Sequence, residues 1–417
     1  MGCNTGLNLP GQIQPSGEEL AGVGLQGRGT YREIENNGSL AAANILPAEA
    51  DPQTVIQGSI STVGDVDVFD LGPVAAQEKL VVQLNLVTIQ RPRLALFDAS
   101  GSALMIDDTL NLVEGHGGVF VEAVFRQDAD HAYAGVASEP GTGSTGDYTL
   151  IITRSFVDDV PPPRPQVVYL NFDGAASVRL GPRPPADIPA FDPADIMGKF
   201  AGQDDALIAA TLEKVRADYA GLNVVFSSSR ESPPPHGSFA TIHVGGYDAD
   251  ALGVAESVDE NNWDPGQQAI VFAKTFASFA VLNPSEDQIS QALANVISHE
   301  VGHLLGLSHT RDPRAIMDVT ASLSQMLGGQ SFRRSPLFGE VFPIGEQDAL
   351  ECLYEAVGGD FQTVQARRTA RAIVTDIGLS ADASEPARAQ HAFTMCFCGR
   401  CEQQRARSAQ AAPCGQP

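Results

Sequence analysis

The sequence predicts a multidomain protein: an antiparallel β-sandwich, then an α+β domain, then an irregular tail that contains a cysteine cluster. Its 417 residues are enough for two or three domains with separate cores. Short alternating apolar segments fill the first third, whereas the middle of the chain mixes strand and helix patterns. We expect a polar tether at 1–35, the sandwich at 36–155, a proline-rich linker at 156–165, the α+β domain at 166–358 and the tail at 359–417.

The sandwich is predicted from short segments with alternating hydrophobicity, separated by glycine, aspartate and asparagine. We expect strands at 54–60, 66–71, 80–87, 94–97, 119–125, 132–136 and 148–152. Short strands with regular turn signals are typical of two packed antiparallel sheets. Because this region and the α+β domain each have an apolar pattern and are joined by a proline-rich linker, we expect each to fold alone.

Turn and core positions of this region carry a resemblance to a known module. They are Glu35-Asn36-Asn37, Gly64-Asp65-Val66-Asp67, Leu94 to Asp98 with Gly101, Tyr133 and Gly146-Asp147-Tyr148. The segment resembles the bacterial pre-peptidase C-terminal domain, a jelly-roll-like module attached to secreted peptidases. Asp65, Asp67 and Asp98 are candidate calcium ligands, but aspartates in turns usually bond their own backbone, and we favour that interpretation.

The α+β domain is predicted because helical spacing of apolar residues alternates with strand-like segments after residue 166. We expect a strand at 167–172, a helix at 207–219, strands at 222–226, 239–244 and 269–273, and a closing helix at 347–354. A further helix is expected at 285–305. Residues 283–286 supply its cap and early negative charge, and an apolar stripe follows at Ile289, Leu293, Val296, Ile297 and Val301.

The end of that helix carries the pattern H-E-x-x-H-x-x-G-x-x-H. His299 and His303, four residues apart, lie on one face of a helix and can reach one cation. Gly306 permits a left-handed exit from the helix, which brings His309 in as a third nitrogen ligand. Three neutral imidazoles and an open position predict one catalytic Zn²⁺. Glu300 lies beside them as the expected general base.

The extended motif, followed by Met317, resembles the metzincin metallopeptidases, and the short gap after His309 is most similar to the matrixin branch. The resemblance implies that Met317 forms an apolar floor beneath the metal. It also implies a zinc-dependent endopeptidase whose substrate extends along 269–273, with a pocket walled by residues between 309 and 342. Asp318 and Val319 stand where some metzincins carry a tyrosine, so that side chain is missing here.

Two alternatives stay open from the sequence. One is a non-enzymatic surface-binding protein with a vestigial zinc domain, although every motif residue is present. The other is a zinc hydrolase of non-peptide amides, because the motif fixes the metal and the base but not the scissile bond.

Charge and cysteines limit the partners. A net charge of −25 argues against nucleic acid, and no apolar run reaches the length of a membrane span. We expect a protein or peptide substrate. No signal peptide is visible, but Gly2-Cys3 fits a lipoprotein whose leader is missing, so Cys3 is a candidate lipid anchor and the protein is expected outside the cell or on its surface. A cytosolic start is the alternative. Cys396, Cys398, Cys401 and Cys414 could form disulfides or a zinc knuckle.

Overall fold

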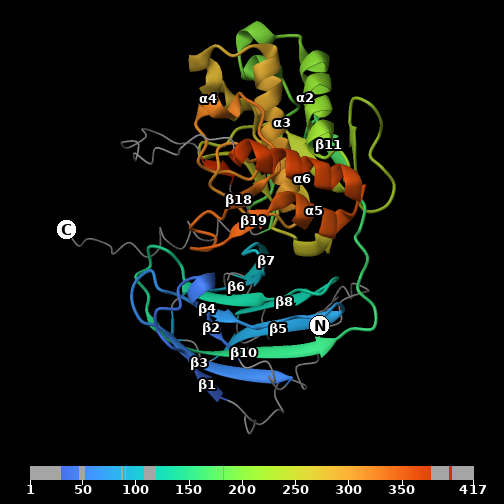
Figure 1. The fold of residues 1–417 in the computed structure, drawn as a ribbon. Coiled ribbons are helices and arrows are strands. Elements are labelled where there is room, and N and C mark those ends of the chain that lie inside the picture. Colours follow the sequence, from blue (N-terminus) through green and yellow to red (C-terminus); the bar gives the residue numbers. More distant parts are fainter. Residues whose placement is uncertain are drawn as a thin grey trace, which may run out of the picture.

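The computed structural model describes residues 30–46, 52–85, 88–89, 91–107, 119–181, 183–376 and 394–396. Figure 1 shows a layered β region in the first part of the chain and a helix-containing region in the second. The candidate anchor Cys3 and the tail residues Cys398, Cys401 and Cys414 lie outside the described residues. Within the described ranges, no helix is both long and apolar enough to span a membrane.

The N-terminal region is a sandwich of two five-stranded sheets. The first has the order β1-β3-β10-β5-β8 and the second β2-β4-β9-β6-β7. The strands of the first sheet are β1 (Thr30–Arg32), β3 (Gln53–Ile60), β10 (Gly146–Phe156), β5 (Glu78–Asn85) and β8 (Val119–Val124). Those of the second are β2 (Asn44–Ile45), β4 (Val66–Asp70), β9 (Ala132–Ser138), β6 (Pro92–Asp98) and β7 (Ala103–Asp107), and one 3-10 turn, η1 (Leu40–Ala42), precedes β2.

All seven predicted strands of the sandwich are present, and the sequence missed the short strands β1, β2 and β7. The sandwich includes residues from Thr30 on, ahead of the predicted position 36, because β1 pairs with β3. That pair and β2–β4 are parallel, and the other ladders of both sheets are antiparallel. One apolar cluster fills the space between the sheets, with Leu80, Leu84, Leu96, Val136 and Leu150 at its centre.

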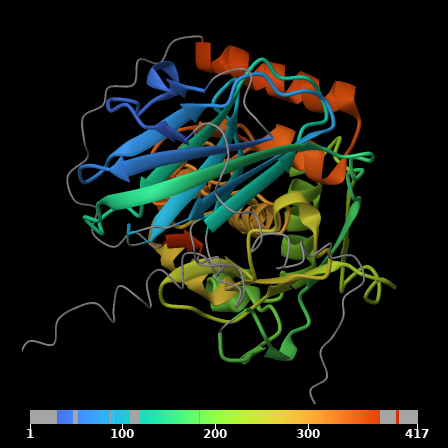
Figure 2. The same ribbon diagram turned by 90° about the horizontal axis from the view of Figure 1, so that it is seen from below.

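The two sheets differ in how they are buried. Strand β5 alternates between buried and half-buried residues, as expected for a sheet with one face in the core. All five residues of β4 are buried, as are six of the seven residues of β6. The second sheet is therefore covered on both faces, and its outer cover comes from the C-terminal region, with Leu337, Val341 and Phe342 in the same cluster as Val68 and Phe97. Figure 2, seen from below, shows the sandwich strands crossing in front of the C-terminal region.

The C-terminal region is built on a six-stranded sheet with the order β14-β11-β15-β17-β16-β20. Its strands are β11 (Gln166–Asn171), β14 (Val224–Ser228), β15 (Ala240–Val244), β16 (Ala251–Ala255), β17 (Gln268–Val271) and β20 (Thr394–Cys396). Strand β16 is antiparallel to β17, and the other ladders are parallel. Two ribbons are added by β12 (Ala175–Val178) with β13 (Ala186–Ile188), and by β18 (Arg334–Pro336) with β19 (Glu346–Asp348).

Helices α2 and α3 pack onto this sheet, and all five helices contribute to one core with it. They are α2 (Asp204–Asp218), α3 (Glu286–His303), α4 (Leu323–Met326), α5 (Ala349–Val357) and α6 (Phe361–Asp376). The 3-10 segments are η2 (Pro193–Asp195), η3 (Gly198–Phe200), η4 (Glu260–Asn262) and η5 (Ala273–Leu282). The helices expected at 207–219, 285–305 and 347–354 correspond to α2, α3 and α5.

Two sequence-based expectations are wrong here. The strand at 269–273 was expected to take substrate at a sheet edge, but β17 lies between β15 and β16, so its backbone is already paired on both sides. The tail was expected to be irregular, but α6 packs against the domain. Val364 is in the core, and Arg367 donates to the carbonyl of Asp218. The C-terminal domain therefore extends beyond residue 358.

Candidate metal centre

Helix α3 delivers the first two histidines, and its start is fixed by a capping box. The Ser285 side chain accepts from the backbone N–H of Gln288, and the Gln288 side chain accepts from that of Ser285. The predicted apolar stripe is buried, with Ile289, Val296 and Val301 each at most 1% exposed. The helix is thereby held by its packing, and its last two turns present the motif.

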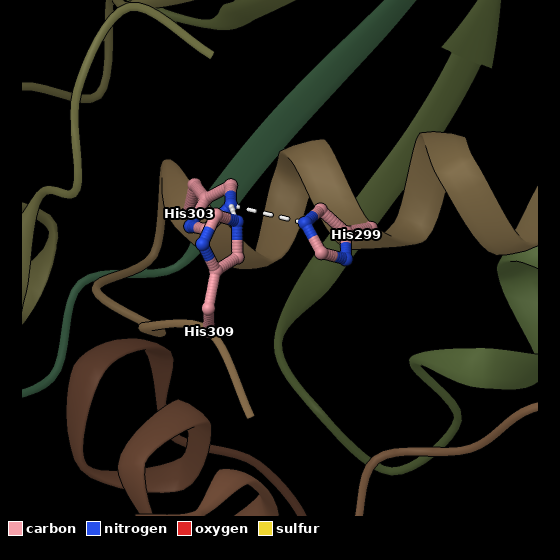
Figure 3. A group of neighbouring side chains, drawn as sticks. All are labelled: His299, His303 and His309. Carbon is pink, nitrogen blue, oxygen red and sulfur yellow. Dashed lines mark hydrogen bonds between the residues drawn. The ribbon is translucent and has the colours of Figure 1, made fainter. Parts of the chain in front are cut away.

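The three motif histidines meet, as Figure 3 shows, with their Nε2 atoms turned toward one another. The Nε2 atom of His303 lies 3.1 Å from that of His299 and 3.0 Å from that of His309. The Nδ1 atom of His299 lies 2.7 Å from the carbonyl oxygen of Ile316, and that of His303 lies 2.7 Å from the carbonyl oxygen of Leu307. Because each carbonyl can only accept, Nδ1 carries the proton and the Nε2 lone pair is left for a metal.

Burial keeps the imidazole of His299 neutral. His299 and His303 are fully buried, and His309 is 3% exposed. Loss of solvation lowers the pKa of His299 to about 4, although the hydrogen bond to Ile316 opposes the shift. A neutral imidazole is the form that binds zinc. The donor set of the centre, three neutral nitrogens converging from one side, therefore fits Zn²⁺.

Gly306 ends the helix as the sequence predicted. Its φ is +91°, and an added Cβ would lie 2.8 Å from the Cα of Glu260. The N–H of Gly306 donates to the carbonyl of His303, and the N–H of Leu307 donates to the carbonyl of Gly302. These two hydrogen bonds form a Schellman motif. The chain turns back through this motif, and His309 consequently faces α3.

Met317 lies beneath the histidine helix. It is 1% exposed, and a Cβ on Gly302 would approach its sulfur to 2.6 Å. The Met317 carbonyl accepts from the N–H of Thr310, directly after the third histidine. The next residue, Asp318, accepts from the N–H groups of Thr320 and Ala321. Asp318 thus holds its own loop, and it does not take the place of the missing tyrosine.

A residue that sequence reasoning missed braces the third histidine. The side-chain amide of Gln347, on β19, accepts from the N–H of Ser308 at 2.7 Å and donates to the Ser308 carbonyl at 3.0 Å. The N–H of Phe338 donates to the carbonyl of His309. Because Gln347 is 38 positions beyond His309, no local pattern in the sequence connects the two.

The expected general base lies against strand β16. Glu300 is fully buried, and a Cβ added to Gly253 would lie 2.4 Å from its Oε1. In the spatial order of the sheet, β16 lies between β17 and the last strand, β20. Glu300, which follows the ligand His299 directly on α3, therefore contacts strand β16.

The structure does not bring the three calcium candidates together. Asp65 accepts from the N–H and hydroxyl of Ser61, and Asp98 accepts from the N–H groups of Ser100 and Ser102, as turn residues do. Asp67 lies within β4, and its carboxyl accepts from the hydroxyl of Tyr148 at 2.7 Å. The turn interpretation therefore describes Asp65 and Asp98, and the calcium expectation gains no support at these positions.

A three-histidine cluster followed along the helix by a buried glutamate is the arrangement typical of mononuclear zinc hydrolases. Residues 242–328 match the family model of the matrixin peptidases. This match confirms, over the residues that it covers, the metzincin-like resemblance seen in the motif. A comparison with curated protein sequences found no match.

Three solved structures are similar to parts of the chain. The archaemetzincin of Methanopyrus kandleri is 14% identical, and the match covers 41% of this chain and 91% of that one with a TM-score of 0.24. The pre-peptidase C-terminal domain of a Bacillus anthracis collagenase is 18% identical, with 27% and 94% covered and a TM-score of 0.20. The periplasmic inhibitor of g-type lysozyme from Aeromonas hydrophila is 11% identical, with 30% and 99% covered and a TM-score of 0.22. Similarities this low assign no activity to the chain.

Proposed function

We propose that this protein is a zinc-dependent endopeptidase in which His299, His303 and His309 hold the metal and Glu300 is the general base. The observation that carries the proposal is the convergence of three buried Nε2 atoms beside a buried glutamate. When bound, zinc supplies Lewis-acid activation of a water molecule and of the scissile carbonyl.

Glu300 moves the proton in this reaction. Its carboxylate takes the proton of the attacking water and then delivers it to the nitrogen of the leaving amine. Glu300 follows His299 directly on α3, so the helix that positions the ligands also positions the base. Burial of the carboxyl group excludes bulk water from competing for the proton.

An extended peptide is the substrate that this site accommodates best. Strand β16 passes Glu300 at Gly253, and a peptide pairing with the outer edge of β16 would lie across the metal centre. Backbone pairing does not depend on side chains. Sequence preference would therefore come from the segment after His309, which includes Phe338 beside the carbonyl of that histidine.

Metal content and peptide cleavage, measured on the same samples, test the proposal. Wild-type protein should contain close to one zinc per chain and cleave a mixed peptide library, and a chelator should stop cleavage. Glu300→Ala should keep the zinc and lose at least about 100-fold in rate, whereas His303→Ala should lose both metal and activity. Full activity in Glu300→Ala would refute the assigned base. Zinc-dependent hydrolysis of non-peptide amides alone would refute the assigned substrate.

A further inference from the structure

The sandwich and the C-terminal domain share a buried contact. Phe97 of β6 packs edge-on against Phe342, with ring centroids 5.6 Å apart. Arg93, also on β6 and 3% exposed, donates to the carbonyl of Val341 at 2.6 Å. Each domain therefore leaves apolar surface that the other covers, and whether either folds alone stays a prediction.

The same contact continues as backbone pairing onto β19. The N–H of Glu346 donates to the carbonyl of Gly101, and the N–H of Asp348 donates to the hydroxyl of Ser102 at 3.0 Å. Both acceptors lie in the turn that leads into β7 of the sandwich. Between those two donors, on the same short strand, stands Gln347.

Side-chain and backbone groups of the 337–348 segment also contact the chain around the third histidine. Gln347 is bonded to both backbone groups of Ser308, and Phe338 is bonded to the carbonyl of His309. Hydrogen bonds on β19 thus connect the sandwich to Ser308, the residue directly before His309. Between His309 and Gln347 the chain contains only the one-turn helix α4 and the three-residue strand β18 as regular elements, so its shape depends on what it packs against.

We propose that the N-terminal sandwich is a structural part of the metal centre, with Arg93 and Ser102 as positioning residues that hold His309 in place through the 337–348 segment. The proposal rests on the proposed function only in taking the three histidines as zinc ligands. Partners that orient a ligand from behind typically change metal affinity by about 10- to 100-fold when they are removed.

Zinc release from the full chain tests this role, and Arg154 provides a matched control. Arg154 is bonded to Glu78 and to the carbonyls of Leu71 and Pro73, all within the sandwich and away from this contact. We expect Arg93→Ala to release zinc to a coloured chelator at least about 10-fold faster than wild type. Ser102→Ala, the milder change, should shift the rate in the same direction. Arg154→Ala should lose folding stability but release zinc at the wild-type rate.

The spectrum of the cobalt-substituted protein provides a second reading that does not need catalysis. Arg93→Ala should alter the visible cobalt bands because the geometry of His309 changes, and Arg154→Ala should leave them unaltered. Wild-type release rates in both Arg93→Ala and Ser102→Ala would overturn the proposal, as would equal acceleration in Arg93→Ala and Arg154→Ala. A zinc-loaded wild type that cleaves no peptide would refute the endopeptidase proposal and leave this one standing.

A separate observation concerns the outer edge of β16. Strand β20, from the C-terminal tail, pairs with β16 in parallel, with Ala251 opposite Thr394 and Gly253 opposite Cys396. Paired strands lie about 4.8 Å apart. The backbone of β20 therefore runs along the strand that contacts Glu300, in the place where a peptide substrate would pair.

We infer that residues 394–396 act as an internal competitor for the peptide site, an inference that rests on the proposed function. The segment is part of the same chain, so its effective concentration at β16 reaches the millimolar range, and even a weak strand contact can compete. Because occupation of the edge excludes substrate without altering the metal centre, it raises KM and leaves kcat unchanged.

Proline substitutions in the full chain test the competition. Met395→Pro removes a backbone donor from β20 and should lower KM for a small peptide by about 10-fold with unchanged kcat. Gln403→Pro, further along the same tail, is the control and should behave as wild type. A synthetic peptide of residues 390–400 should bind the Met395→Pro protein more tightly than wild type, a measurement that needs no catalysis. Equal peptide binding by the two proteins would overturn the inference.

Discussion

Gly253 and Glu300 are in contact across the interface between strand β16 and helix α3. A Cβ atom on Gly253 would lie 2.4 Å from Oε1, 2.8 Å from Cδ and 2.9 Å from Cγ of Glu300. Since real Cβ atoms do not approach other atoms this closely, the glycine is what allows the edge strand and the base to coexist. The positions of strand β16, where we propose that a peptide pairs, and of the proposed base Glu300 thus depend on the same glycine.

Replacing Gly253 should therefore separate metal binding from catalysis. We expect Gly253→Ala to bind zinc normally and to lose about 100-fold in kcat. The added methyl group displaces the Glu300 carboxylate, and a displacement of about 1 Å can cost this much in rate. Gly198→Ala is a suitable control, since an added Cβ there meets nothing within 4 Å. Peptide turnover and zinc content measured together decide the matter, and unchanged turnover in Gly253→Ala would contradict the placement of the base.

The zinc helix could be predicted because its signals are local. A cap at Ser285, an apolar stripe and the spacing of the histidines all lie within one stretch of chain, and the structure has each of them. Gly306 was predictable for the same reason, because a left-handed exit from a helix depends on the backbone at one position.

Three other features depend on partners that are distant in sequence. They are strand β16, the hydrogen bonds of Gln347 to Ser308, and the contact between the sandwich and the C-terminal domain. Strand β16 has a central glycine, which weakens a strand pattern, and its place in the sheet follows only from long-range pairing with β17 and β20. The continuous apolar run from Leu94 to Phe97 did hold a signal, because strands buried on both faces lack alternation. Helix α6 was overlooked although alanine, arginine and glutamine are good helix formers.

Gly302 and Met317 give a second steric prediction. A Cβ on Gly302 would approach the Met317 sulfur to 2.6 Å, so Gly302→Ala should lower the free energy of unfolding by about 1–3 kcal/mol. Met317→Ala makes room for the methyl group of Gly302→Ala. The double variant should therefore lose less free energy of unfolding than the sum of the losses of the two single variants. Urea denaturation of the four proteins measures this coupling. Strict additivity would show that the two residues do not press on each other.

Met317 itself is expected to act through packing. Met317→Leu keeps a similar volume, so it should retain zinc and most of the peptidase activity. Zinc content and kcat/KM are the measurements, with Met326→Leu, another buried methionine of the same core, as the comparison. Outright loss of zinc in Met317→Leu alone would contradict the view that Met317 is an apolar floor.

The Gln347 amide should be needed for metal affinity. Gln347→Ala removes both bonds to Ser308, whereas Gln347→Glu keeps an acceptor for the Ser308 N–H but places an oxygen against its carbonyl. We expect zinc affinity to fall by about 10- to 100-fold in Gln347→Ala. The affinity deficit of Gln347→Glu relative to wild type should be smaller at the lower pH, where a protonated carboxyl group can donate to the Ser308 carbonyl. Titration with a competing chelator at two pH values measures both effects. A zinc affinity equal to that of wild type in Gln347→Ala would contradict the role of Gln347 in positioning His309.

Asp67 should make the stability of the sandwich depend on pH. It is fully buried, and burial, followed by its hydrogen bond with Glu33, raises the pKa of Asp67 to about 9 from an ordinary 3.8. The folded state therefore keeps a proton that the unfolded chain releases. The stabilisation from this group is complete below the unfolded pKa and is lost as the pH rises from there through the folded pKa.

Asp67→Asn isolates this effect, because asparagine cannot titrate, yet it can accept from Tyr148 and donate to Glu33. At pH 8 the variant should unfold with a free energy about 1–2 kcal/mol larger than wild type, and the gap should close toward pH 4. Urea denaturation across this range measures it, with Asp98→Asn, a turn residue of the same sandwich, as the control. An Asp67→Asn protein that is less stable than wild type at pH 8 would show that the carboxyl group is ionised in the folded state.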